Sequence, residues 1–304
     1  MRFDVRLCIA AVTLLLAACG GGALPSGLTP AFPDPTPVQS RDPASTWFWL
    51  RASVTQALPP VEVFSMAVMQ PYVRITGDGL VVTLDPVPAI FPGPLVPNLQ
   101  ASQLSEAGRT AILASAKELG LLSGPTDFSS GEPVMGGVSG RIELTVDGNL
   151  VTLTGDPTAS IQCTATPCEP QPAGSAAAFA QFWHRLGDLS SWIPDELGPE
   201  SAYEAPAYAI LVGPAPEPDP NLPQAPMDWP LEQPLALFGG PVGDGSYRCG
   251  TVTGADAATL LPALQAANQL TPWVQDSSTS ATFGLAVRPM VPGEDVCREV
   301  FGPA

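Results

Sequence analysis

Proline is the residue that most restricts how this chain can fold, because it lacks a backbone N–H donor and fixes its own φ angle. The 304 residues include 37 prolines and 29 glycines. The excess of proline divides into three stretches: the segment before residue 46, an apolar loop at 86–98 and a linker-like stretch at 212–234. We expect the first stretch, which also contains Gly20-Gly21-Gly22, to be an extended tether.

The charge balance is strongly acidic, and it excludes several classes of partner. The chain has 12 basic and 29 acidic residues, a formal net charge of -17. Such a surface repels nucleic-acid phosphates and anionic lipid headgroups, so we expect no nucleic-acid partner. The single histidine leaves no material for a metal site with several histidine ligands and little for a histidine-based triad. With 45% apolar residues, the chain has enough hydrophobic side chains for a folded core.

The N-terminus has the parts of an export signal. Arg2 and Arg6 form a positive start, and residues 7–18 are a nearly unbroken apolar run. This run is too short to cross a bilayer, which takes about 20 residues. It ends in Leu16-Ala17-Ala18-Cys19-Gly20, which resembles the lipobox of bacterial lipoproteins.

The lipobox resemblance implies a membrane anchor. In that class the chain is cut just before the cysteine, the thiol receives a diacylglycerol, and the new amino terminus is acylated, as with palmitate. We therefore interpret residues 1–18 as a lipoprotein signal peptide, Cys19 as the lipidation site and residues 19–45 as a Gly- and Pro-rich tether. The mature chain would be extracytoplasmic and lipid-anchored to a bacterial membrane. The alternative is an ordinary secretory signal cleaved near Ala18.

Cysteine usage agrees with export. Cys8 leaves with the signal and Cys19 carries the lipid, so four cysteines remain, an even number that favours disulfides in an exported chain. Of the three possible connectivities we favour Cys163–Cys168 together with Cys249–Cys297. The first pair would close a small loop, and the second would tie a strand to the C-terminal segment. A zinc site is the alternative, but it usually needs two sets of closely spaced cysteines, so we expect no metal.

After residue 46 the chain predicts a recurring order of hairpin, loop and helix. In the first unit, residues 61–76 and 80–84 form strands around the turn Gly77-Asp78-Gly79. Ser105 is a suitable N-cap for the following helix, and Gly120 is a suitable stop.

In the second unit, residues 141–146 and 150–153 form strands around Asp147-Gly148-Asn149. Its helix spans 175–186, with an apolar stripe at helical spacing. The stripe consists of Phe179, Phe182, Trp183 and Leu186. The third unit is looser, with strands at 208–212, 246–252 and 282–287 and a helix that begins at the N-cap Thr253. Pro262 should kink or restart that helix.

These patterns predict an α+β fold of antiparallel hairpins with helices packed on one face, in two or three similar hairpin-helix units. We expect an N-terminal α+β domain or subdomain at 46–195 and a C-terminal one at 196–304.

Several short motifs resemble one family. The most specific are Phe91-Pro92-Gly93-Pro94 and Thr271-Pro272-Trp273. The others are Gly77-Asp78-Gly79, Leu95-Val96-Pro97-Asn98-Leu99, Leu104-Ser105-Glu106-Ala107-Gly108, Leu186-Gly187-Asp188-Leu189-Ser190-Ser191-Trp192, Cys249-Gly250 and Leu270. With them the chain resembles an uncharacterised family of bacterial envelope proteins from high-GC organisms, many of which carry lipoprotein signals. The resemblance covers most of residues 60–297 and implies location and domain extent, but no activity and no catalytic residue.

The search for catalytic residues yields two candidates. On a helical wheel His184 lies on the solvent side, with Asp188 one turn later, so we interpret it as a surface residue. The densest acidic cluster lies beside Trp192 and Tyr203, and it consists of Asp195, Glu196, Glu200 and Glu204. Carboxylates beside aromatic rings can bind or cleave sugars, although a solvated acidic loop is the simpler interpretation. No Walker loop, dinucleotide fingerprint or nucleophile elbow is present in the sequence, so we expect no cofactor and assign no catalytic residue.

The apolar loop at 86–98 is a further candidate. An exposed proline-rich segment can be a recognition surface, but one this apolar more often packs against its own core. Two functional hypotheses follow. The first is a non-enzymatic binding or structural module of the cell envelope, whose partner is an envelope protein or a cell-wall glycan. The alternative is an extracytoplasmic hydrolase that acts on glycans through paired carboxylates.

The lipobox makes a direct prediction. Cys19→Ser removes the thiol that would carry the diacylglycerol, so the variant should lose labelling by a fatty-acid probe and move from the membrane to the soluble fraction. Cys8→Ser is the matched control, since that cysteine precedes the expected cleavage site. Labelling that persists in Cys19→Ser would place the anchor elsewhere.

Overall fold

The computed structural model describes residues 48–56, 72–85, 90–129, 138–161, 171–275 and 281–301, all within one compact unit. In this part of the chain the fold is mixed, with two open sheets and five helices, so the predicted combination of helices and strands is confirmed. Cys19, Cys163 and Cys168 lie outside the described residues, as do the signal and tether and most of the strand predicted at 61–76.

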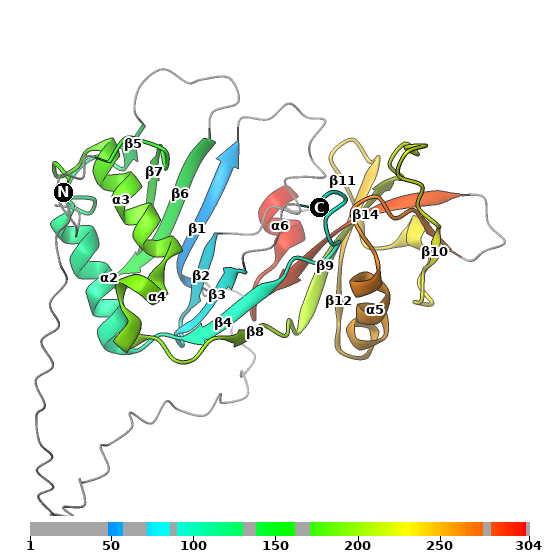
Figure 1. The fold of residues 1–304 in the computed structure, drawn as a ribbon, viewed down its shortest axis with the longest axis horizontal. Coiled ribbons are helices and arrows are strands. Elements are labelled where there is room, and N and C mark those ends of the chain that lie inside the picture. The colour runs from blue at the N-terminus through cyan, green and yellow to red at the C-terminus, as the bar shows by residue number, and fades with distance from the viewer. Residues whose placement is uncertain are drawn as a thin grey trace, which may run out of the picture. The chain divides into compact units, whose positions relative to one another are not determined.

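The larger sheet has eight strands in the order β5-β7-β6-β1-β2-β3-β4-β8 (Figure 1). All pairs are antiparallel except β5 with β7. The strands are β1 (Phe48–Gln56), β2 (Val73–Thr76), β3 (Leu80–Leu84), β4 (Leu99–Gln103), β5 (Asp127–Phe128), β6 (Val138–Val146), β7 (Asn149–Gly155) and β8 (Ser201–Ala202). Asp147 and Gly148 join β6 to β7 with φ angles of 49° and 79°, the left-handed conformation of a two-residue hairpin turn.

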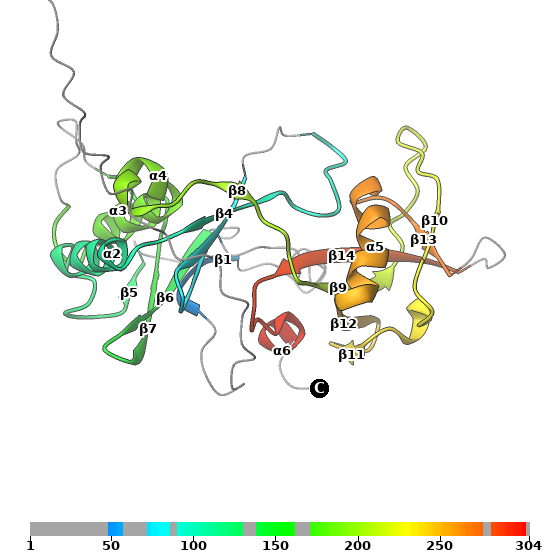
Figure 2. The same cartoon turned by 90° about the horizontal axis from the view of Figure 1, so that it is seen from below.

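Three helices cover one face of this sheet: α2 (Glu106–Glu118), α3 (Ala176–Gly187) and α4 (Leu189–Trp192) (Figures 1 and 2). The N-cap predicted at Ser105 is confirmed, and Ser175, the predicted start of the next helix, is an N-cap as well. Thr253 is also an N-cap, of the helix Gly254–Ala266, but its side chain makes no capping hydrogen bond. The side chain of Ser105 accepts a hydrogen bond from the Gly108 amide at 3.0 Å, and that of Ser175 accepts one from the Ala178 amide at 3.1 Å. These bonds satisfy donors that the first turn of a helix leaves unpaired.

Helix α3 packs on the sheet through the apolar stripe expected from its sequence. The four residues of the stripe are buried, and Phe179 and Trp183 lie over β6 and β7. Gly155 makes this close approach possible, because a Cβ atom there would lie 2.7 Å from the Phe179 ring. Any larger residue at position 155 would therefore clash with the Phe179 ring.

The smaller sheet has six strands in the order β10-β13-β14-β9-β12-β11. All pairs are antiparallel except β10 with β13. The strands are β9 (Ala207–Pro214), β10 (Met227–Asp228), β11 (Gly240–Val242), β12 (Tyr247–Thr253), β13 (Trp273–Val274) and β14 (Thr282–Met290).

Helices lie on both faces of the smaller sheet, which differs from the predicted packing on one face. Ile210 of β9 shares a core cluster with residues of α5 (Gly254–Ala266), whereas Ala209 clusters with Val296 of α6 (Val296–Phe301). Figures 1 and 2 show the two helices on opposite sides of β9. The physical reason is the sequence of β9, which is apolar at consecutive positions and so buries both of its faces.

Helix α5 continues through Pro262, so the expected kink or restart is not seen as a break in the helix. Pro262 is exposed, and its ring faces away from the core that Leu260 and Leu264 enter. A proline has no N–H group, so Pro262 donates no hydrogen bond to the carbonyl of Ala258, four residues earlier.

The chain passes from the first sheet to the second within residues 203–206, between β8 and β9. This position is a few residues beyond the boundary expected at 195/196. Because both sheets belong to one compact unit, a division into two domains stays a prediction. Among the described helices, none has the length and the apolar character that crossing a bilayer requires.

Cys249 of β12 and Cys297 of α6 form a disulfide, one of the two pairs favoured from the sequence. The two residues are 48 positions apart and pack with Leu211 and Ala286 on the α6 face of the smaller sheet. The bond therefore fastens the short helix α6, which is too short to be stable alone, to the sheet.

Replacing both cysteines, Cys249→Ser and Cys297→Ser, should lower the free energy of unfolding by about 4 kcal/mol, because the unfolded chain regains the entropy of a long open loop. Urea denaturation measures the change. A reducing agent should destabilise the wild type more than the double variant, in which only the bond expected between Cys163 and Cys168 is left to reduce. A loss well under 1 kcal/mol would contradict the role given to this bond.

Candidate functional site

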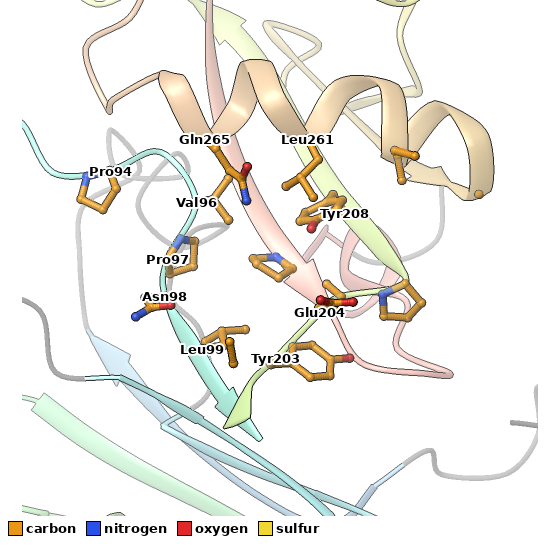
Figure 3. A pocket seen from close by; sticks show the side chains of 17 residues that line it. Pro94, Val96, Pro97, Asn98, Leu99, Tyr203, Glu204, Tyr208, Leu261 and Gln265 are labelled. Atoms are coloured by element: carbon orange, nitrogen blue, oxygen red, sulfur yellow. The ribbon is translucent and has the colours of Figure 1, made fainter. Parts of the chain in front are cut away.

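A groove of about 750 Å³ opens beside helix α5. Its described lining comes from residues 94–99, which lead into β4, from residues 202–208, which lead from β8 into β9, from α5, and from Pro289 of β14. The groove thus gathers segments that lie far apart in the sequence (Figure 3).

The lining combines hydrocarbon surface with a few polar groups. Glu204 is exposed and is the one charged side chain in the described lining. In the view of Figure 3 its carboxylate lies between the rings of Tyr203 and Tyr208, and the Tyr208 hydroxyl points into the groove. The amide of Gln265 reaches the groove from α5. The Asn98 amide donates a hydrogen bond to Asp85 at 2.5 Å.

Both tyrosines stay protonated at neutral pH. Burial raises the pKa of Tyr208, and the negative charge of Glu204 raises it further. Burial also raises the pKa of Tyr203, whose hydroxyl donates a hydrogen bond to the Met290 carbonyl at 2.9 Å. Because that hydroxyl is engaged by the backbone, Tyr203 offers the groove mainly its ring.

The proline-rich loop is held against the segment after α5. The Gln269 amide donates to the Gly93 carbonyl at 3.0 Å, and the Leu95 amide donates to the Ala267 carbonyl at 3.3 Å. The expected packing of this loop against the core is correct for Leu95, which joins the core of the smaller sheet. It is wrong for Ile90 and Phe91, whose exposed fractions are 65% and 68%.

A buried cluster of charges stabilises the end of β14, next to Pro289 of the groove. Glu294 accepts hydrogen bonds from Arg74 of β2, at 3.1 Å, and from Arg288 of β14. It also accepts one from the Val291 amide at 3.1 Å, while Arg74 donates to the Pro289 carbonyl at 3.3 Å. All three charged side chains are buried. The cluster therefore joins the larger sheet to the smaller one through a single carboxylate.

A second set of ion pairs lies nearer to solvent. Arg51 of β1 pairs with Glu143 of β6 at 2.7 Å and with Glu299 of α6. Burial alone would raise the pKa of Glu143, but a hydrogen bond from Arg141 and the charge of Arg51 hold it below its ordinary value. Arg51 thus links the larger sheet to the helix that the disulfide fastens to the smaller sheet.

The structure does not bring the acidic cluster of the sequence together. Glu204 lines the groove, whereas Glu200 lines a smaller cavity beside β3 and β4. Glu196 accepts a hydrogen bond from the Ser105 hydroxyl at the start of α2. Asp195 is exposed. Trp192 packs edge-on against Phe182 with ring centres 6.4 Å apart, so it belongs to the core under α3 and α4.

His184 is exposed on α3, as its helical position predicts. The carboxylate of Asp188 accepts a hydrogen bond from the Ser191 amide at 3.2 Å and so caps α4. Across the described residues, no group of three or more His, Cys, Asp and Glu side chains is arranged to hold a metal ion.

The sequence pointed to Glu204 and to the apolar loop at 86–98, but not to the groove that they help to line. Helix α5 was recognised by its apolar face, yet it lines the groove both with Leu261, which was expected to be buried, and with the exposed residues Ala258 and Gln265. No local signal marks these residues, because the groove depends on tertiary packing.

Comparisons of the chain with protein-family models, with curated proteins and with solved structures each gave no match. The resemblance to the envelope family accordingly stays a prediction from the motifs.

Glu294→Gln should lower the free energy of unfolding by about 3–5 kcal/mol, because it leaves Arg74 and Arg288 buried without a compensating charge. The matched control is Glu299→Gln, which removes the same group from a partly exposed ion pair and should cost about 1 kcal/mol or less. Chemical denaturation of both variants measures the difference. Equal losses in the two variants would show that the buried cluster does not join the sheets as described.

Proposed function

We propose that this chain is a lipid-anchored extracytoplasmic protein that acts as a non-enzymatic binding module of the cell envelope, with its ligand held in the groove beside α5. The observation that carries the proposal is the lining of the groove. Hydrocarbon surface, two tyrosines and a few polar groups form a concavity of about 750 Å³, within the usual range for ligand sites.

The location part of the proposal rests on the sequence. The positive start, the short apolar run and the Leu16-Ala17-Ala18-Cys19 motif support an anchor at Cys19, and the Gly- and Pro-rich residues 19–45 suit a tether. The resemblance to envelope proteins of high-GC bacteria supports the same location.

Binding is preferred to glycan hydrolysis because of the carboxylates. Glycosidases of the common type need two carboxylates about 5–9.5 Å apart on either side of the scissile bond. The described lining contains a single carboxylate, Glu204. Its neighbours in the sequence lie elsewhere, since Glu196 bonds Ser105 at the start of α2 and Glu200 lines the smaller cavity beside β3 and β4.

We also propose that the fold contains similar hairpin-helix units. The order of the elements supports this proposal, because α3 follows the β6–β7 hairpin and α2 follows the β2–β3 hairpin, there with β4 in between.

A photo-crosslinker at Gln265 tests the binding function. The full-length chain is expressed in its own envelope, and crosslinking should give a discrete adduct with one envelope component. Ala258→Trp fills the groove from the exposed side of α5 and should reduce this adduct at least tenfold.

Ala255→Trp is the matched control, because Ala255 is also exposed on α5 but lies outside the described lining. The adduct should survive in that variant. Adduct formation that is equal in the two variants, or release of cleaved glycan by the purified chain, would overturn the proposal.

A further inference from the structure

We propose that the groove binds a basic side chain of a partner protein, with the ammonium or guanidinium group beside Glu204 and its aliphatic stem along the apolar lining. This inference rests on the proposed binding function and adds the chemistry of the ligand. It draws on the charge of the groove, its aromatic rings and the apolar surface next to it.

Charge selects a cation. Among the described residues, Glu204 has no ion-pair partner, and no lining residue carries a positive charge. The net charge of the whole chain, -17, attracts basic partners toward its surface and repels acidic ones. A cationic group in the groove would therefore pair with the Glu204 carboxylate, the one charge of the described lining.

The other polar groups also favour a ligand that donates hydrogen bonds. The rings of Tyr203 and Tyr208 flank the carboxylate in Figure 3, and aromatic faces attract ammonium and guanidinium groups. The carboxylate of Glu204 and the Tyr208 hydroxyl, which points into the groove, can both accept hydrogen bonds. An ammonium group has three donors and no acceptor, which matches these acceptors.

The apolar lining suits the stem of a basic side chain. Val96 lines the groove from the segment before β4 and Leu261 lines it from α5. Lysine and arginine commonly lay their methylene groups along such apolar surface while the charge stays hydrated.

Exposed apolar side chains in the loop that leads to the groove point to a protein as the carrier of this side chain. Ile90 and Phe91, in the same loop as the lining residue Pro94, expose 65% and 68% of their surface. Adjacent exposed apolar side chains of this size are typical of interaction surfaces. A protein partner can cover them while its basic side chain enters the groove.

The first experiment compares two small probes on the full-length lipoprotein in detergent micelles. They are Nα-acetyl-lysine methylamide and its norleucine counterpart, which has an uncharged side chain of similar length. Ligand-observed NMR should show that the lysine probe binds roughly tenfold more tightly, as expected for one ion pair with aromatic contacts. Raising the salt concentration should reduce this preference, because salt screens the pair.

Glu204→Gln should abolish the preference for lysine and leave the weak binding of norleucine unchanged. Glu217→Gln is the matched control, since it removes an equally exposed carboxylate outside the described lining and should keep the preference. Equal binding of both probes by the wild type, or a preference that survives in Glu204→Gln, would overturn the inference.

The second experiment uses the adduct formed by the photo-crosslinker at Gln265. Protease should digest the crosslinked component, and Phe91→Ser should weaken the adduct several-fold. Acetylation of envelope amines, together with modification of envelope guanidines, before crosslinking should remove the adduct. An adduct that resists protease but yields to glycan-cleaving enzymes would overturn the assignment to a protein. If Ala258→Trp removes the adduct and Glu204→Gln does not, the binding function stands and this inference fails.

Discussion

The carboxylate of Glu294 holds together two parts of the fold that the chain connects only through short segments. It accepts hydrogen bonds from one arginine of the larger sheet and one of the smaller sheet, in a place that water does not reach. In such surroundings the attraction between opposite charges is strong, and so is the cost of leaving one of them unpaired. The backbone next to this cluster contributes Pro289 to the groove and receives the hydroxyl of Tyr203. The position of the candidate site therefore depends on this ion cluster.

The sequence predicted those structural elements that depend on interactions between residues close together in the chain. Ser105 caps a helix, and Asp147-Gly148 turns a hairpin, because each acts through bonds and backbone angles within a few residues. Other elements have a tertiary cause. Helix α6 covers β9 from the second face only because the chain returns there and a disulfide fixes it, and a run of apolar residues does not reveal which segment will cover it.

The site was less predictable than the fold. Glu204 could be named from the sequence because acidic residues gather around it, yet the groove also needs α5 and Pro289, which packing brings there from distant parts of the chain. The loop at 90–98 shows the same limit. Its apolar residues predicted burial, and Leu95 enters the core with Val96 packed against it, but Ile90 and Phe91 are exposed. The composition gives the number of apolar side chains, but it does not tell which of them pack in the core and which remain exposed for a partner.

The ion pairs also bear on the order in which this protein can fold. Arg74 and Glu294 are 220 residues apart in the sequence, and Arg51 and Glu299 are 248 apart. Contacts between such distant residues form late, since the entropy of closing a large loop must be overcome before the contact stabilises anything. Late formation of these contacts suits the export that we propose, because a chain must stay unfolded while it crosses a membrane.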